Sequence, residues 1–152
     1  MAGQSVTVSS TIAAPRERVW EIITDLDQAK ARVSAISEIE RLTEGPYATG
    51  TRWRETRTVF GRAESQELEV VEAIEPERTV VASAAGAVRY VTTMDLAADP
   101  VGTLLTVTFD VELPEAAMTR MMARMMGPLG SMFTRKMLTK ELDDIRAAAT
   151  QS

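Results

Sequence analysis

The chain has 152 residues, which is enough for one domain with a sizeable hydrophobic core. Its formal net charge is −5 and its basic residues are scattered among acidic ones, so no nucleic-acid partner is expected. The sequence has no cysteine and no histidine, which excludes disulfides, thiolate nucleophiles, Ser-His-Asp triads and most transition-metal sites. We predict a single domain over residues 1–152 that uses no metal and no cofactor.

The start of the chain is polar and lacks the apolar segment that a signal peptide contains. No run of apolar residues reaches the length of about 18 that a membrane span requires. The sequence therefore predicts a cytoplasmic protein with no membrane span.

The first elements are a strand followed by helical segments. Residues 5–12 alternate apolar and polar side chains, a pattern typical of a half-buried strand. Pro15 suits the first position of a helix, where a missing N–H needs no partner. The residues at helical spacing after it are Val19, Trp20, Ile22, Ile23 and Leu26. A second, short helical piece is expected near residues 26–32, and Trp20 is assigned to the core.

A run of strands follows, separated by glycine and proline turns. We expect strands near residues 37–43, 51–60, 62–74, 78–85, 88–97 and 102–113. Sequential strands joined by short turns favour an antiparallel sheet.

The final segment predicts one long helix from Pro114 to about Ala149, with a kink or break at Gly127-Pro128. One face of its first half is rich in methionine: Met118, Met121, Met122, Met125, Met126, Leu129, Met132 and Phe133. Such a face is typical either of a core helix or of the deformable wall of a ligand cavity. Opposite a sheet and beside a break, it reads better as a cavity wall, and the break could act as a hinge.

The order of elements predicts an α+β fold, in which a curved antiparallel sheet of about seven strands (β-α-α-β6-α) wraps around a long, kinked C-terminal helix. An antiparallel sheet must bury one face, and the last helix has the widest apolar face available to cover it.

Five segments carry a resemblance to a known group of proteins. They are residues 9–20, with Pro15, Val19 and Trp20; Leu26-Asp27; residues 50–53, which end in Trp53; residues 71–76; and residues 102–106. In order and spacing they resemble the SRPBCC (START-like, helix-grip) superfamily, and within it the polyketide cyclase/dehydrase and lipid-transport group. The resemblance implies a deep cavity between sheet and helix. Members bind sterols, lipids, quinones, plant hormones or polyketides, and some catalyse cyclisation or dehydration.

Strand alternation selects candidate cavity residues. If Trp53 points inward, Glu55, Arg57 and Val59 share its face. The opposite register would bury Arg52 and Arg54, which is costly unless they are paired. On a later strand, Tyr90, Thr92, Met94 and Leu96 share one side. The candidate ligand-binding residues are therefore Trp53, Glu55, Arg57, Tyr90, Met94, Met118, Met122, Met125, Met126, Leu129 and Phe133.

Three of these candidates have side chains capable of catalysis. Tyr90 could donate a hydrogen bond to a ligand carbonyl, Arg57 could hold a carboxylate or enolate, and Glu55 could act as a general base. The alternative for each is a purely structural hydrogen bond.

The first functional hypothesis is a monomer or homodimer that binds or carries a small hydrophobic molecule of lipid, quinone or polyketide type. The second is a metal-free polyketide cyclase, dehydratase or aromatase that uses Glu55, Arg57 and Tyr90. The third is a protein-interaction module, which a closed cavity and a large exposed apolar patch would favour.

Overall fold

The structure is a computed structural model that describes residues 2–59, 61–114 and 128–151. The elements, in chain order, are β1 (Ala2–Ile12), α1 (Arg16–Thr24), the 3-10 turn η1 (Leu26–Gln28), α2 (Ala29–Arg32), β2 (Ile36–Arg41), β3 (Arg52–Val59), β4 (Arg62–Ile74), β5 (Arg78–Ala85), β6 (Val88–Ala98), β7 (Thr103–Leu113) and α4 (Pro128–Thr150). The predicted α+β order of elements is confirmed.

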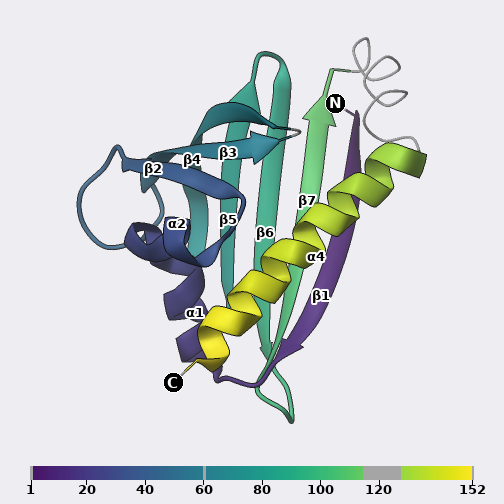
Figure 1. Ribbon diagram of the computed structural model, residues 1–152. Helices are drawn as coiled ribbons and strands as arrows, with labels where there is room; N and C mark the ends of the chain where they lie inside the picture. Colours follow the sequence, from purple (N-terminus) through teal and green to yellow (C-terminus); the bar gives the residue numbers. More distant parts are fainter. Residues whose placement is uncertain (1, 60, 115–127, 152) are drawn as a thin grey trace.

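All seven strands form one antiparallel sheet in the order β1-β7-β6-β5-β4-β3-β2. Strands β2 to β6 each pair with the next along the chain, whereas β1 pairs with β7. The first two strands therefore lie at opposite edges, and α1 and α2 connect them (Figure 1). Helix α4 runs diagonally across the sheet in front of β7 and β1 (Figure 1).

The main core lies where α4 meets the sheet and α1. Four residues at helical spacing on α4 are buried: Leu138, Leu142, Ile145 and Ala149. They belong to one cluster with Val8, Leu105 and Trp20, among others, so the assignment of Trp20 to the core is confirmed. This packing fixes α4 over the β1 side of the sheet and leaves space above the other strands.

The predicted boundaries differ from the structure by a few residues. The first strand begins at Ala2 rather than Ser5, and Pro15 is the N-cap of α1 rather than its first residue. The short helical piece consists of η1 and the single turn α2. Residues 115–127 lie outside the described residues; they include Gly127 of the expected break, Met118, Met122, Met125 and Met126, whereas α4 is described from Pro128 onward.

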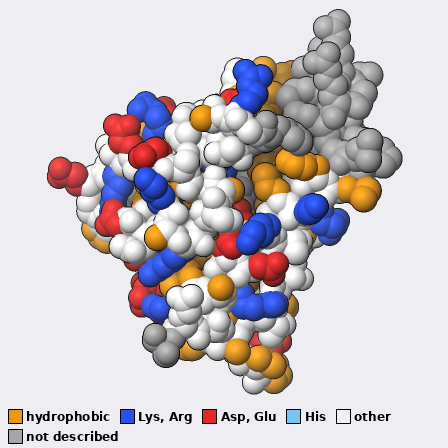
Figure 2. Space-filling view, in the orientation of Figure 1, with side chains coloured by type: hydrophobic (Ala, Val, Ile, Leu, Met, Phe, Trp, Pro, Cys, Tyr) orange, Lys and Arg blue, Asp and Glu red, His pale blue; other side chains and the backbone are white. Residues whose placement is uncertain are grey.

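The surface carries both signs of charge. On the face shown in Figure 2, lysine and arginine side chains are interspersed with aspartate and glutamate. Among the described residues, no helix is long and apolar enough to cross a membrane. The same part of the chain contains no group of three aspartate or glutamate side chains positioned to hold a metal ion.

Candidate functional site

A cavity of about 410 Å³ lies between the concave face of the sheet and the helices. Strands β2 to β7 supply its floor, and α1, η1, α2 and α4 supply its cover. Most of its surface is apolar, with contributions from Leu26, Val33, Trp53, Met94 and Ile145 among others. Its size and composition are typical of a small-molecule site.

Strand β3 contributes the main polar groups of the cavity. Trp53, Glu55 and Arg57 alternate onto its inner face, and both Trp53 and Glu55 are 5% exposed. Arg52 and Arg54 lie on the outer face, where they pair with surface glutamates. The predicted inward register of Trp53 is therefore confirmed.

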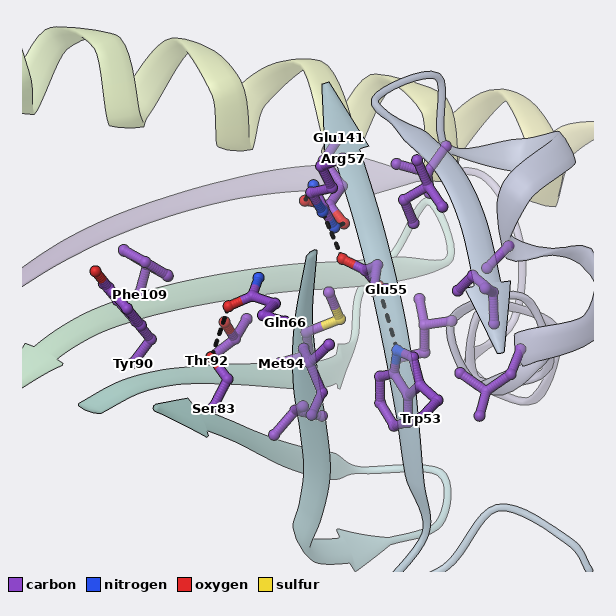
Figure 3. A pocket seen from close by; sticks show the side chains of 18 of the residues that line it. Trp53, Glu55, Arg57, Gln66, Ser83, Tyr90, Thr92, Met94, Phe109 and Glu141 are labelled. Carbon is purple, nitrogen blue, oxygen red and sulfur yellow. Dashed lines mark hydrogen bonds and ion pairs between the residues drawn. The ribbon is translucent and has the colours of Figure 1, made fainter. Parts of the chain in front are cut away.

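The inner face of β3 meets α4 in a three-residue charged cluster, Glu55–Arg57–Glu141. Arg57 Nε donates to Glu55 Oε2 over 2.5 Å, and Arg57 Nη2 and Nη1 donate to Glu141 Oε1 and Oε2 over 3.1 and 3.5 Å. Trp53 Nε1 donates to Glu55 Oε1 over 3.3 Å, as Figure 3 shows. One arginine thus links the floor of the cavity to its helical cover.

The surroundings of Arg57 strongly favour the protonated, positively charged form of its guanidinium. Burial alone would lower the pKa of Arg57, but the negative charges and hydrogen bonds of Glu141 and Glu55 outweigh burial and raise it. With both carboxylates ionised, the cluster holds two negative charges and one positive charge. Its net charge is −1.

Strand β6 supplies a second set of predicted residues. Tyr90, Thr92 and Met94 all line the cavity. Tyr90 stacks on Phe109 of β7, with ring centroids 5.9 Å apart and an interplanar angle of 19°, and burial raises its pKa. In Figure 3, Met94 and Gln66 lie between the Tyr90–Phe109 stack and Trp53. Tyr90 therefore shares the cavity with Glu55 and Arg57 but stands on the other side of it.

A hydrogen bond between two uncharged side chains lies between the charged cluster of β3 and the Tyr90–Phe109 stack. Ser83 Oγ on β5 donates to Gln66 Oε1 on β4 over 2.9 Å, and both residues line the cavity (Figure 3). Gln66 is also the direct cross-strand partner of Glu55. The floor thus presents an amide and a hydroxyl beside the buried carboxylate.

Tyr47 is a lining residue that sequence reasoning missed. Its ring lies edge-on to Trp20, with centroids 6.3 Å apart, and 6.4 Å from Trp53. Its hydroxyl is 2.6 Å from Thr79 Oγ1. Burial raises the pKa of Tyr47 to about 12, although the hydrogen bond with Thr79 opposes this shift. Tyr47 lies between β2 and β3, outside any helix or strand, so no periodic pattern pointed to it.

Glu141 was missed as well, although the sequence contains a signal for it. It lines the cavity from α4 together with Met137, Leu138 and Ile145. A carboxylate among apolar residues at helical spacing is costly to bury without a partner, so it indicates a paired charge.

The remaining predicted residues stay untested as ligand contacts. Phe133 is 40% exposed and is not among the described residues that line the cavity. Leu129 lies in α4, but its side chain is outside the description, as are Met118, Met122, Met125 and Met126.

Comparisons with known proteins agree with the architecture. The profile of the family described as polyketide cyclase / dehydrase and lipid transport matches residues 3–150. Comparison with curated protein sequences gives no significant match.

Several solved structures share the fold. TTHA0849 from Thermus thermophilus is 20% identical with a TM-score of 0.77, over 96% of this chain and 97% of that one. The di-domain ARO/CYC BexL from the BE-7585A biosynthetic pathway is 18% identical with a TM-score of 0.72, over 97% of this chain and 48% of BexL. Ara h 8.0201 is 14% identical with a TM-score of 0.71, over 97% and 98% of the two chains.

At these identities the structural likeness establishes the fold alone, and that fold is the predicted helix-grip arrangement. The family match covers almost the entire sequence. The chain therefore belongs to the polyketide cyclase/dehydrase and lipid-transport family of the SRPBCC superfamily.

Proposed function

We propose that this protein binds or carries a small hydrophobic ligand, of lipid, quinone or polyketide type, in the cavity between the sheet and α4. The observation that carries the proposal is the cavity of about 410 Å³, whose lining is mostly apolar with a few grouped polar side chains. Apolar walls supply affinity by removing ligand surface from water, and the few polar groups orient the ligand.

The first test is native mass spectrometry of freshly purified protein, combined with titration of the uncharged fluorophore N-phenylnaphthylamine. We expect a co-purified apolar ligand or saturable binding of the fluorophore. The absence of both would overturn the proposal.

A cavity-filling variant then locates the binding. Thr92 lines the cavity, so Thr92→Trp should remove most fluorophore binding by placing an indole in the ligand space. The matched control is Thr106→Trp on β7, where Thr106 alternates with the buried residues Leu105 and Val107. The control should bind as the wild type does, whereas equal losses in both variants would point to a site elsewhere.

The alternative function is that of a metal-free cyclase or dehydratase. It is favoured by the presence of Glu55, Arg57 and Tyr90 in one cavity. In this scheme Glu55 takes a proton from the carbon between the carbonyl and the hydroxyl-bearing carbon of a β-hydroxyketone, the C–O bond of the hydroxyl breaks as the C=C bond forms, and the hydroxyl leaves as water with the proton returned by Glu55. Tyr90 donates a hydrogen bond to a second polar group of the ligand, on the other side of the cavity. Proton transfer to a positioned carboxylate is a common route for such chemistry.

An aromatic β-hydroxyketone separates the two functions, because its dehydration gives a conjugated enone with a new ultraviolet absorbance. A carrier returns the compound unchanged. Dehydration above the buffer rate that is lost in Glu55→Gln, but retained in Glu40→Gln on the outer surface, would establish the enzyme instead.

A further inference from the structure

The charged residues that line the cavity include more acidic than basic side chains. Three carboxylates face it, from Glu55, Glu64 and Glu141, and two guanidinium groups, from Arg32 and Arg57. With the carboxylates ionised, the lining has a net charge of −1. A negative net charge disfavours the binding of an anionic ligand.

Arg57 and Arg32 are both already paired with carboxylates of the protein, so neither guanidinium is free to bind an anionic ligand. Arg57 directs Nε to Glu55 and both terminal nitrogens to Glu141, which uses the two-pronged geometry that a ligand carboxylate would need. Arg32 pairs with Asp25 across 3.4 Å. A ligand carboxylate at Arg57 would have to displace Glu141 and would then lie beside two other negative charges. The hypothesis that Arg57 holds a ligand carboxylate or enolate is therefore disfavoured.

The carboxylates of Glu55 and Glu141 can still accept further hydrogen bonds. Each carboxylate oxygen offers about two acceptor sites. Glu55 Oε1 accepts from Trp53 and Oε2 from Arg57, and each Glu141 oxygen accepts once from Arg57. In Figure 3, Glu55 lies toward Gln66, on the cavity side of the cluster. A ligand that donates a hydrogen bond can therefore be accommodated without breaking any of these contacts.

We propose that the cavity selects uncharged hydrophobic ligands that carry a hydroxyl or N–H donor, and that Glu141 causes the exclusion of carboxylates, sulfonates and phosphates. Glu141 does so in two ways: it is hydrogen-bonded to the guanidinium of Arg57, which a ligand anion would need, and it gives the cluster a negative net charge. This inference rests on the proposed function, since it names the chemical class of ligand for the same cavity.

The test compares two fluorophores with the same aromatic skeleton. N-phenylnaphthylamine is uncharged and has one N–H donor, whereas anilinonaphthalene sulfonate carries an added negative charge. We expect the wild-type protein to bind the uncharged compound at least about tenfold more tightly. Thr92→Trp serves as the blank, because fluorescence that survives in this variant does not come from the cavity.

The charge is then changed at one position. Glu141→Gln keeps the size of the side chain and makes the cluster neutral, so sulfonate binding should tighten about tenfold with little change for the amine. Glu40→Gln is the matched control: Glu40 pairs with Arg54 on the outer face of the sheet, and the two fluorophores should be unaffected. Glu64→Gln is a second variant that removes a charge from the lining at an exposed position.

Each outcome decides between the ideas. Equal or tighter binding of the sulfonate by the wild type would overturn the selection of uncharged ligands while leaving a hydrophobic binder intact. An unchanged preference in Glu141→Gln would overturn the role proposed for Glu141, and an unchanged preference in Glu64→Gln as well would overturn any role of the lining charge. Failure of both fluorophores to bind, with no co-purified ligand, would overturn the proposed function itself.

Discussion

The guanidinium of Arg57 on β3 forms a two-pronged ion pair with the carboxylate of Glu141 on α4, although 84 residues separate them in sequence. Each side chain is only 19% exposed. The pair is thus a direct bond between the floor and the cover of the cavity, made by groups that are costly to bury alone. Its removal should affect both stability and ligand choice.

We expect Arg57→Leu to lower the free energy of unfolding by about 3 kcal/mol, because it leaves the buried carboxylate of Glu55 and the partly buried carboxylate of Glu141 without their cation. Urea denaturation followed by circular dichroism measures the change. The matched control is Arg54→Leu on the same strand, whose exposed ion pairs with Glu40 and Glu67 should cost less than about 1 kcal/mol. Equal losses of unfolding free energy in the two variants would show that the ion pairs of Arg57 stabilise the protein no more than the exposed ion pairs of Arg54 do.

Tyr47 should make the protein less stable in alkali. Its pKa is raised from 10.0 to about 12, so the folded chain keeps the phenolic proton at a pH where the unfolded chain releases it. The contribution of Tyr47 to the free energy of unfolding is therefore fully present below pH 10 and is lost as the pH rises from 10 to about 12. Urea midpoints over this range, compared with those of Tyr47→Phe, should show a steeper decline for the wild type. Parallel declines would contradict the assignment.

Asp144 joins α4 to the segment before β2, since its Oδ2 accepts from the backbone N and the Oγ of Ser34 over 3.1 and 3.0 Å. Burial alone would raise the pKa of Asp144, but hydrogen bonds from Ser34 and Lys140 and the charge of Lys140 outweigh burial and lower it below 3.8. The ionised form therefore adds stability above this pH, and the contribution is lost in stronger acid.

Asp144→Asn should accordingly cost about 1 kcal/mol near neutral pH. The difference from the wild type should shrink as the pH falls below 3.8, which urea unfolding at several pH values can measure. Asp143→Asn is the neighbouring control at an exposed position. A deficit that is constant with pH would point to packing rather than charge.

Gly102 lies where the β6–β7 turn approaches the end of β1. A Cβ atom at this position would be 2.5 Å from the carbonyl oxygen of Ile12 and 2.7 Å from the backbone nitrogen of Ala14. Because these are backbone atoms, Gly102→Ala should destabilise the fold by about 2 kcal/mol or more. Gly86→Ala, in open space at a φ of +62°, should cost about 1 kcal/mol. The reverse order of thermal midpoints would contradict this account.

The sequence was sufficient to predict the sheet and the inward face of β3. Alternation is a local property, and burying Arg52 and Arg54 would have been costly, so the orientation of Trp53, Glu55 and Arg57 followed from residues on one strand. Tyr90 and Met94 were placed on the cavity side for the same reason. The helical spacing of Glu141 among apolar residues indicates a paired charge, but its partner Arg57 depends on where α4 crosses the sheet, which no local pattern encodes. Tyr47 was missed because loops lack periodicity.

The sheet order also has a consequence for the folding pathway. Strands β2 to β7 form nearest-neighbour hairpins, so each pairing closes a short loop, whereas Thr7 on β1 meets Thr108 on β7 across 101 residues. The entropic cost of closing a loop rises with the length of the loop, and nonlocal pairings slow folding. We expect β1 to join last, so pulse-labelled hydrogen exchange should find its amides protected after those of β4 and β5. Since α4 packs on β1 and its neighbours, the cavity would gain the part of its cover that α4 supplies only in this final step.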